Sequence, residues 1–157
     1  MKRLDSDFTV TGTQCTGWLY QPDRVMRPPV VIMAHGLGAE RTSRLPAYAE
    51  KFAERGLASF VFDYRNFGDS AGYPRNLINP WRHIHEWIGA IEHVSSLDAI
   101  DAYRIAAGRA LRCVHELSAV YISGVEEILN IARGHSDAQS QIIPGWWTVI
   151  LDRVHGN

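Results

Sequence analysis

The chain has 157 residues, 46% of them apolar, and a formal net charge of -1 at pH 7. This length fits one domain with a sizeable core. The near-neutral charge, with basic residues scattered along the chain, argues against a nucleic-acid partner. The two cysteines, Cys15 and Cys113, are too far apart in the sequence to indicate a metal centre.

The N-terminus and the hydropathy indicate a cytoplasmic protein without a membrane segment. The first eight residues, MKRLDSDF, include basic residues but no apolar leader segment. No apolar run approaches the ~20 residues of a membrane-spanning helix. Since thiols stay reduced in the cytoplasm, no disulfide is predicted.

Residues 8–20 predict an antiparallel hairpin. Residues 8–11 alternate apolar and polar side chains, residues 12–14 have turn composition, and residues 18–20 form a second short strand. Two prolines then lead into Val30–Ala34, five apolar residues without alternation. Such a strand is typical of a parallel sheet that is covered on both faces.

Residues 42–62 predict a helix followed by a second buried strand. Thr42 or Ser43 is expected to cap the helix, Pro46 falls in its first turn, and Gly56 ends it. Between these signals apolar residues recur at helical spacing: Leu45, Tyr48, Ala49, Phe52 and Ala53. The apolar residues 58–62 follow as the next strand, which completes a strand–turn–helix–strand unit.

Two further helices are predicted. One runs from Pro80 to about Ser95 with Asn79 as its N-cap. Its apolar face is expected to comprise Trp81, Ile84, Ile88 and Ile91. Between residues 98 and about 119 apolar side chains again step by three or four, which predicts a helix despite Gly108.

Polar turns follow the two buried strands. His35-Gly36-Leu37-Gly38 comes directly after Val30–Ala34, and DYRNFGDSAG (63–72) comes directly after residues 58–62. With these two motifs the stretch resembles the α/β-hydrolase family over about residues 8–105. The segment INPW at residues 78–81 is similar to bacterial esterase and peptidase-like serine hydrolases. In that family the third strand lies between the fourth and the fifth.

The resemblance implies an α/β fold class, namely the N-terminal half of an α/β-hydrolase fold. A β-hairpin would be followed by parallel strands with flanking helices, and the C-terminal third would be mostly helical. Residues 1–105 would form a partial hydrolase domain. Residues 106–157 have no counterpart in the family pattern and are predicted to be a helical tail or a stretch translated out of frame.

The resemblance also implies that HGLG is an oxyanion turn. The backbone N–H of Leu37 would be the oxyanion-hole donor, and Gly36 and Gly38 would allow the tight backbone path. His35 is then expected to be structural and not a base. No metal or cofactor is expected, because His83 and His85 are two apart on a helix and point to different faces.

The nucleophile is missing where the resemblance places it. A G-x-S-x-G elbow should follow a strand that begins at Arg104-Ile105, but the sequence continues AAGRALRC. Ser70 lies in a literal match, GDSAG, and is a weak candidate because turn residues follow it instead of a helix. No other catalytic residue is assigned. Asp63 and Arg65 are expected to form a structural pair or to anchor the loop.

The favoured hypothesis is a truncated or frame-shifted serine hydrolase of ester or amide bonds. It would lack nucleophile, acid and base and be inactive as this chain, whereas an intact enzyme would bind a small-molecule ester or amide. The alternatives are a short non-catalytic interaction protein that reuses the half-fold, and an active hydrolase with a divergent nucleophile. Without a fifth strand, Val30–Ala34 would be an exposed edge through which the chain self-associates.

Overall fold

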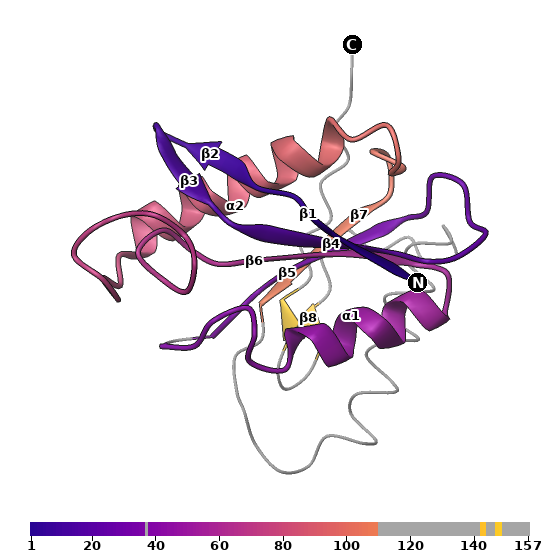
Figure 1. Cartoon of the computed structure of the whole chain (residues 1–157), viewed down its shortest axis with the longest axis horizontal. Coiled ribbons are helices and arrows are strands. Elements are labelled where there is room, and N and C mark those ends of the chain that lie inside the picture. Colours follow the sequence, from indigo (N-terminus) through magenta and orange to yellow (C-terminus); the bar gives the residue numbers. More distant parts are fainter. Residues whose placement is uncertain (37, 110–141, 144–146, 149–157) are drawn as a thin grey trace.

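A computed structural model describes residues 1–36, 38–109, 142–143 and 147–148. Within these ranges a five-stranded sheet has a helix on each face (Figure 1). Helix α1 (Leu45–Glu54) covers one face, and helix α2 (Pro80–Ser95) covers the other together with a short hairpin. The predicted α/β class is confirmed.

The sheet is mixed, with the strand order β1, β4, β6, β5, β7. β1 (Lys2–Asp5) is antiparallel to β4 (Gly17–Gln21), which is antiparallel to β6 (Ala58–Phe62). β5 (Val30–Ala34) runs parallel to both β6 and β7 (Ile105–Arg109). All residues of β5 and β6 are buried, as their almost wholly apolar sequences predict, and Ser59 of β6 is the polar exception.

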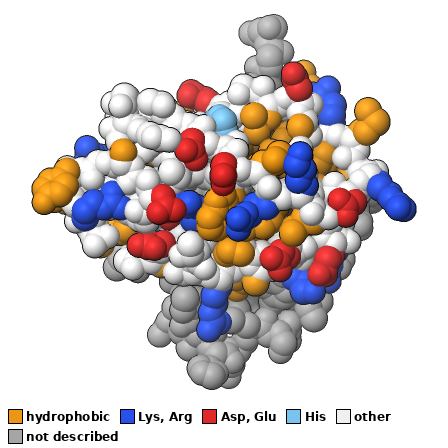
Figure 2. Space-filling model, in the orientation of Figure 1, with side chains coloured by type: hydrophobic (Ala, Val, Ile, Leu, Met, Phe, Trp, Pro, Cys, Tyr) orange, Lys and Arg blue, Asp and Glu red, His pale blue; other side chains and the backbone are white. Residues whose placement is uncertain are grey.

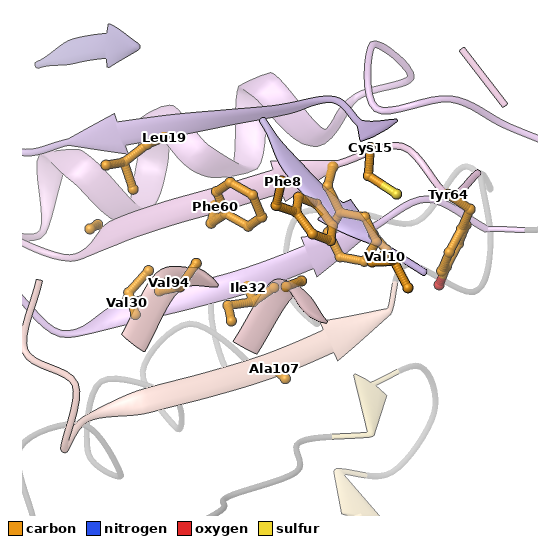
Figure 3. Packing of buried hydrophobic residues seen from close by; sticks show 14 of the residues in the cluster. Phe8, Val10, Cys15, Leu19, Val30, Ile32, Phe60, Tyr64, Val94 and Ala107 are labelled. Carbon is orange, nitrogen blue, oxygen red and sulfur yellow. The ribbon is translucent and has the colours of Figure 1, made fainter. Parts of the chain in front are cut away.

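The core has two parts, one on each face of the sheet, because side chains alternate along the central strands. Ile32 belongs to the cluster on the α2 side, and Met33 belongs to the cluster on the α1 side. On the α2 side, Phe8 of the hairpin, Phe60 of β6 and Val94 of α2 join Ile32 in one cluster (Figure 3). Each fully buried apolar side chain of this size contributes roughly 1.5–3 kcal/mol.

The N-terminal hairpin differs from the predicted one. β2 (Phe8–Val10) pairs with β3 (Thr13–Cys15). The intervening Thr11 and Gly12 have φ of 47° and 76°, which is typical of a tight two-residue hairpin turn. Residues 18–20, the predicted partner strand, lie in β4 instead, where their backbone groups pair with β1 and β6.

β7 corrects two predictions. The helix predicted over residues 98–119 is wrong for residues 105–109, which form a strand with Ile105 opposite Val30. A helix there would leave one side of β5 without backbone partners, whereas the strand supplies them. Val30–Ala34 is therefore an interior strand and not the exposed edge expected to mediate self-association.

The described residues of the tail are also strands. β8 (Ile142–Ile143) and β9 (Trp147–Thr148) pair antiparallel. The remainder of the predicted third helix, residues 110–119, and the other tail positions predicted as helical lie outside the described residues. In the described part of the chain, β1 and β7 are the outer strands of the main sheet.

Helix α1 follows the predicted signals except at its N-cap, and Pro46 lies in its first turn as expected. Its N-cap is Arg44, with φ of 65° and no side-chain cap, so neither Thr42 nor Ser43 has the expected role. At the other end Gly56 has φ of 82° and donates its N–H to the Ala53 carbonyl at 3.0 Å. This is the predicted glycine stop.

Helix α2 begins as predicted but buries a different face. The side chain of Asn79 accepts hydrogen bonds from two N–H groups of the first turn at 3.1 and 3.2 Å. The predicted apolar face is largely exposed, with exposed fractions of 76% for Trp81 and 49% for both Ile84 and Ile88. The buried residues of α2 include an acid, Glu86, whose burial the periodicity did not indicate.

On the face shown in Figure 2, acidic and basic side chains are interspersed among apolar ones. Neither α1 nor α2, the helices in the described ranges, is long and apolar enough to cross a membrane.

Candidate functional site

The loops that follow β5 and β6 lie at the same edge of the sheet. Because the strands are parallel, with Ala34 opposite Phe62, their carboxyl ends coincide. β7 ends there too, since Arg109 is opposite Ala34. Residues 35–44 and 63–79 emerge at the left of the sheet in Figure 1. In open α/β sheets ligands bind at this edge.

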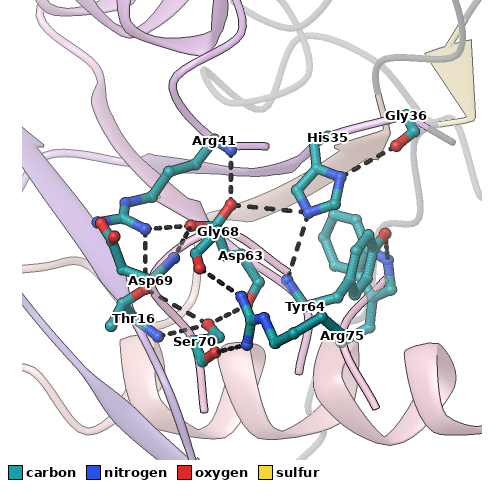
Figure 4. Close-up of polar contacts among 11 residues, drawn as sticks. Thr16, His35, Gly36, Arg41, Asp63, Tyr64, Gly68, Asp69, Ser70 and Arg75 are labelled. Atoms are coloured by element: carbon teal, nitrogen blue, oxygen red, sulfur yellow. Dashed lines mark hydrogen bonds and ion pairs between the residues drawn. The ribbon is translucent and has the colours of Figure 1, made fainter. Parts of the chain in front are cut away.

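His35 is a buried side chain that holds the start of the turn. Its Nε2 lies 3.4 Å from the backbone N–H of Tyr64, which can only donate, so Nε2 accepts. Its Nδ1 then carries the proton and donates to the Gly36 carbonyl at 3.0 Å (Figure 4). The ring stands edge-on to that of Tyr64 with centroids 4.8 Å apart. Both ring nitrogens are thus engaged with the backbone of the two loops.

The turn requires a glycine at position 38 for its backbone conformation. The Gly36 carbonyl also accepts a hydrogen bond from the Ala39 N–H at 3.3 Å, which closes a tight turn. Gly38 has φ of 69°, and a Cβ there would meet no heavy atom within 4 Å. Its requirement is therefore the left-handed backbone and not close packing. Leu37 lies outside the described residues, and its role as oxyanion donor stays a prediction.

The buried carboxylate of Asp63 joins the two loops. One oxygen accepts the backbone N–H of Arg41 at 2.6 Å, and the other pairs with the Arg41 guanidinium. Asp63 therefore does not pair with Arg65, and the alternative expectation, that Asp63 anchors the loop, is confirmed. The Arg41 guanidinium also contacts Asp69 at 2.7 Å (Figure 4). This network escaped sequence reasoning because its members come from different loops.

Ser70 is buried, with 1% of its surface exposed. Its hydroxyl donates to the Asp63 carbonyl at 2.8 Å and accepts the Thr16 N–H at 2.9 Å. Gly72 follows with φ of 116°, and the next helix begins only at Pro80. A nucleophilic serine needs an accessible hydroxyl beside a base. The observed bonds instead tie the loop after β6 to Thr16, between β3 and β4, and Ser70 stays a weak candidate.

Arg65 pairs with an acid from α2. Its Nε lies 2.6 Å from Oε1 of Glu86, and both side chains are at most 4% exposed. Burial raises the pKa of Glu86, although the Arg65 charge acts in the opposite direction. Beside this pair, burial raises the pKa of the Cys15 thiol to about 12. Cys15 is therefore an inert core thiol, and it is free.

A serine–histidine contact does occur, but at the other end of α2. The hydroxyl of Ser6 lies 2.8 Å from Nε2 of His93, whose ring stacks on Phe8 at 5.7 Å. Burial lowers the pKa of His93 and so favours its neutral form. The contact fastens the N-terminal segment to α2. Sequence reasoning assigned no partner to His93.

The two histidines at the start of α2 separate as predicted. His83 stacks on Tyr64 with ring centroids 4.1 Å apart, whereas His85 is exposed. Within the described ranges no group of three or more His, Cys, Asp or Glu side chains could hold a metal ion.

Comparison with known proteins finds similarity over part of the chain, although no protein-family model matches it. The quorum-quenching protein AidA of Acinetobacter baumannii is 44% identical over 102 residues, 65% of this chain and 34% of AidA. The thiohydrolase aneE of Aspergillus aculeatus is 33% identical over 94 residues, 60% of this chain and 29% of aneE. The chain thus spans about a third of the length of these relatives.

Among solved structures, the α/β hydrolase GrgF from Penicillium sp. sh18 matches with a TM-score of 0.66 and 28% identity, over 70% of this chain and 38% of GrgF. Part of this chain is α/β-hydrolase-like. The resemblance seen in HGLG and the loop after β6 is confirmed. The sheet order agrees as well, with β5 between β6 and β7 as the third strand lies between the fourth and fifth.

One alignment of this hydrolase-like chain continues into the tail. A polyketide transferase of Gibberella fujikuroi is 26% identical over 152 residues, 96% of this chain and 46% of the transferase. The alignment therefore extends beyond Ile105, the point after which no family motif is recognisable in the sequence.

Proposed function

We propose that residues 1–109 form the oxyanion-turn half of a serine hydrolase domain that acts on ester or amide bonds, thioesters included. The observation that carries the proposal is the position of HGLG at the carboxyl end of the central strand β5, with the His35 imidazole fixed to the Gly36 carbonyl. The thiohydrolase among the relatives supports an acyl-transfer reaction.

In this proposal the N–H of Leu37 stabilises the negative charge that develops on the substrate oxygen. The neighbouring residue supports the proposal, since the Gly36 carbonyl is held by the His35 imidazole at 3.0 Å. A single donor of this kind is worth about 2.7–4 kcal/mol in the transition state.

We further propose that the chain is a truncated or frame-shifted product without its own nucleophile, acid and base, and so is inactive alone. The sequence AAGRALRC, which stands where the resemblance places a G-x-S-x-G elbow, supports this. A small-molecule ester or amide would be the substrate of the intact enzyme. A cytoplasmic location agrees with the free thiol of Cys15.

The second candidate is a short interaction protein that reuses the half-fold in its native reading frame. The alignment that covers 96% of the chain supports its native reading frame, although it does not bear on an interaction role. The coding DNA distinguishes the two: a G-x-S-x-G encoded out of frame near Gly108 would support the first, and its absence would overturn it. Turnover of p-nitrophenyl butyrate or an acyl thioester by the purified chain would contradict inactivity.

A further inference from the structure

We propose that Arg41 is a positioning residue that fixes the HGLG turn against the loop after β6. The inference rests on the proposed role of that turn, since it concerns how the turn is held. Arg41 lies three residues after Gly38, in the segment between the turn and α1, and is only 4% exposed. A buried arginine in a connecting loop needs a structural explanation, because burying an unpaired charge is costly.

The backbone and the side chain of Arg41 hold the same carboxylate. The N–H donates to Oδ1 of Asp63 at 2.6 Å, and Nη1 pairs with Oδ2. The peptide of the turn segment and its guanidinium are thus both fixed to the first residue after β6. Asp63 also accepts the N–H of Asp69 at 3.3 Å and lies 3.7 Å from Nε2 of His35. One carboxylate therefore meets both ends of residues 35–41.

The remaining contacts of the guanidinium reach β4 and the loop after β6. Nη1 donates to Thr16 Oγ1 at 2.8 Å, and Nη2 donates to Oδ2 of Asp69 at 2.7 Å. The guanidinium lies over the Trp18 ring, 4.2 Å from its centroid. These contacts use the planar, forked shape of arginine, which lysine cannot reproduce. Arg41 therefore joins its own loop to Thr16 and to the loop after β6, which contains Asp63 and Asp69 (Figure 4).

Amide hydrogen exchange in the full chain can distinguish local positioning of the turn by Arg41 from stabilisation of the whole fold. The Arg41→Met variant removes the fork, and Arg41→Lys keeps the charge. Arg44→Met is the matched control, since Arg44 is an exposed arginine of the same loop. Asp69→Asn is a milder probe, because the Asp69 side chain is 73% exposed. Loss of its charge leaves the ion pair between Arg41 and Asp63 intact.

We expect Arg41→Met to accelerate amide exchange in residues 36–44 by roughly tenfold or more, with exchange in α2 unchanged. Arg41→Lys should recover part of the protection, Asp69→Asn should lose a smaller part, and Arg44→Met should match the wild type. Equal acceleration in the turn and in α2, or no acceleration in the turn, would overturn the proposal. The readout needs no catalysis, so it stands apart from any failure of the proposed hydrolase function.

Discussion

Arg65 and Glu86 form an ion pair of 2.6 Å inside the protein, with 4% and 1% of their side chains exposed. The pair joins the loop after β6 to the middle of α2, and Arg65 Nη1 also contacts the hydroxyl of Thr11 in the hairpin turn. The second carboxylate oxygen of Glu86 has no hydrogen-bond partner in the described structure. The two charges therefore depend on each other.

Glu86→Ala should destabilise the fold strongly, because it leaves the Arg65 charge buried and unpaired. We expect a loss of about 3–5 kcal/mol in the free energy of unfolding, measured by urea denaturation. Glu92→Ala makes the same change at an exposed position of α2 and should cost no more than about 0.5 kcal/mol. Equal losses in the two variants would show that the pair is not important for stability.

The Glu86 carboxyl should also give stability a specific pH dependence. Burial raises its folded-state pKa above the ordinary 4.5, so the folded protein binds this proton more tightly than the unfolded chain. Its favourable contribution is complete below pH 4.5 and is lost as pH rises through the folded-state pKa. The free energy of unfolding of the wild type, minus that of Glu86→Gln, should therefore fall as pH rises above 4.5. A difference that rises or stays constant would contradict this.

Gly68 tests how tightly Asp63 is enclosed. A Cβ at Gly68 would overlap the Asp63 carboxylate, and the residue has φ of 48°. Gly12→Ala is the matched control, because Gly12 has φ of 76° but no heavy atom within 4 Å of the added Cβ. Gly12→Ala should cost about 1–2 kcal/mol from backbone strain alone. Gly68→Ala should cost at least about 2 kcal/mol more by urea denaturation, and similar costs would mean that Asp63 moves aside freely.

Much of the fold could be predicted because its signals are local. β5 and β6 are short runs of apolar residues, and the caps at Asn79 and Gly56 depend only on neighbouring residues. The family could be recognised for a similar reason, since HGLG and the loop after β6 are contiguous motifs.

The predictions that were wrong or missing concern residues whose structure depends on a partner far away in the sequence. Residues 105–109 have apolar spacing typical of a helix, but the unpaired backbone of β5 makes them a strand. The inward position of Glu86 depends on Arg65, 21 residues earlier in the chain. The role of Arg41 could not be predicted from the sequence, because its partner Asp63 lies 22 residues later, after β6. A pattern of polar residues does not identify which two of them meet.

Labelling with a fluorophosphonate serine probe tests most directly whether this chain has a working nucleophile. The wild-type chain should remain unlabelled, because the Ser70 hydroxyl is buried and bonded to the backbone of Asp63 and Thr16. Labelling that is present in the wild type and disappears in Ser70→Ala would contradict this and make GDSAG a true nucleophile motif.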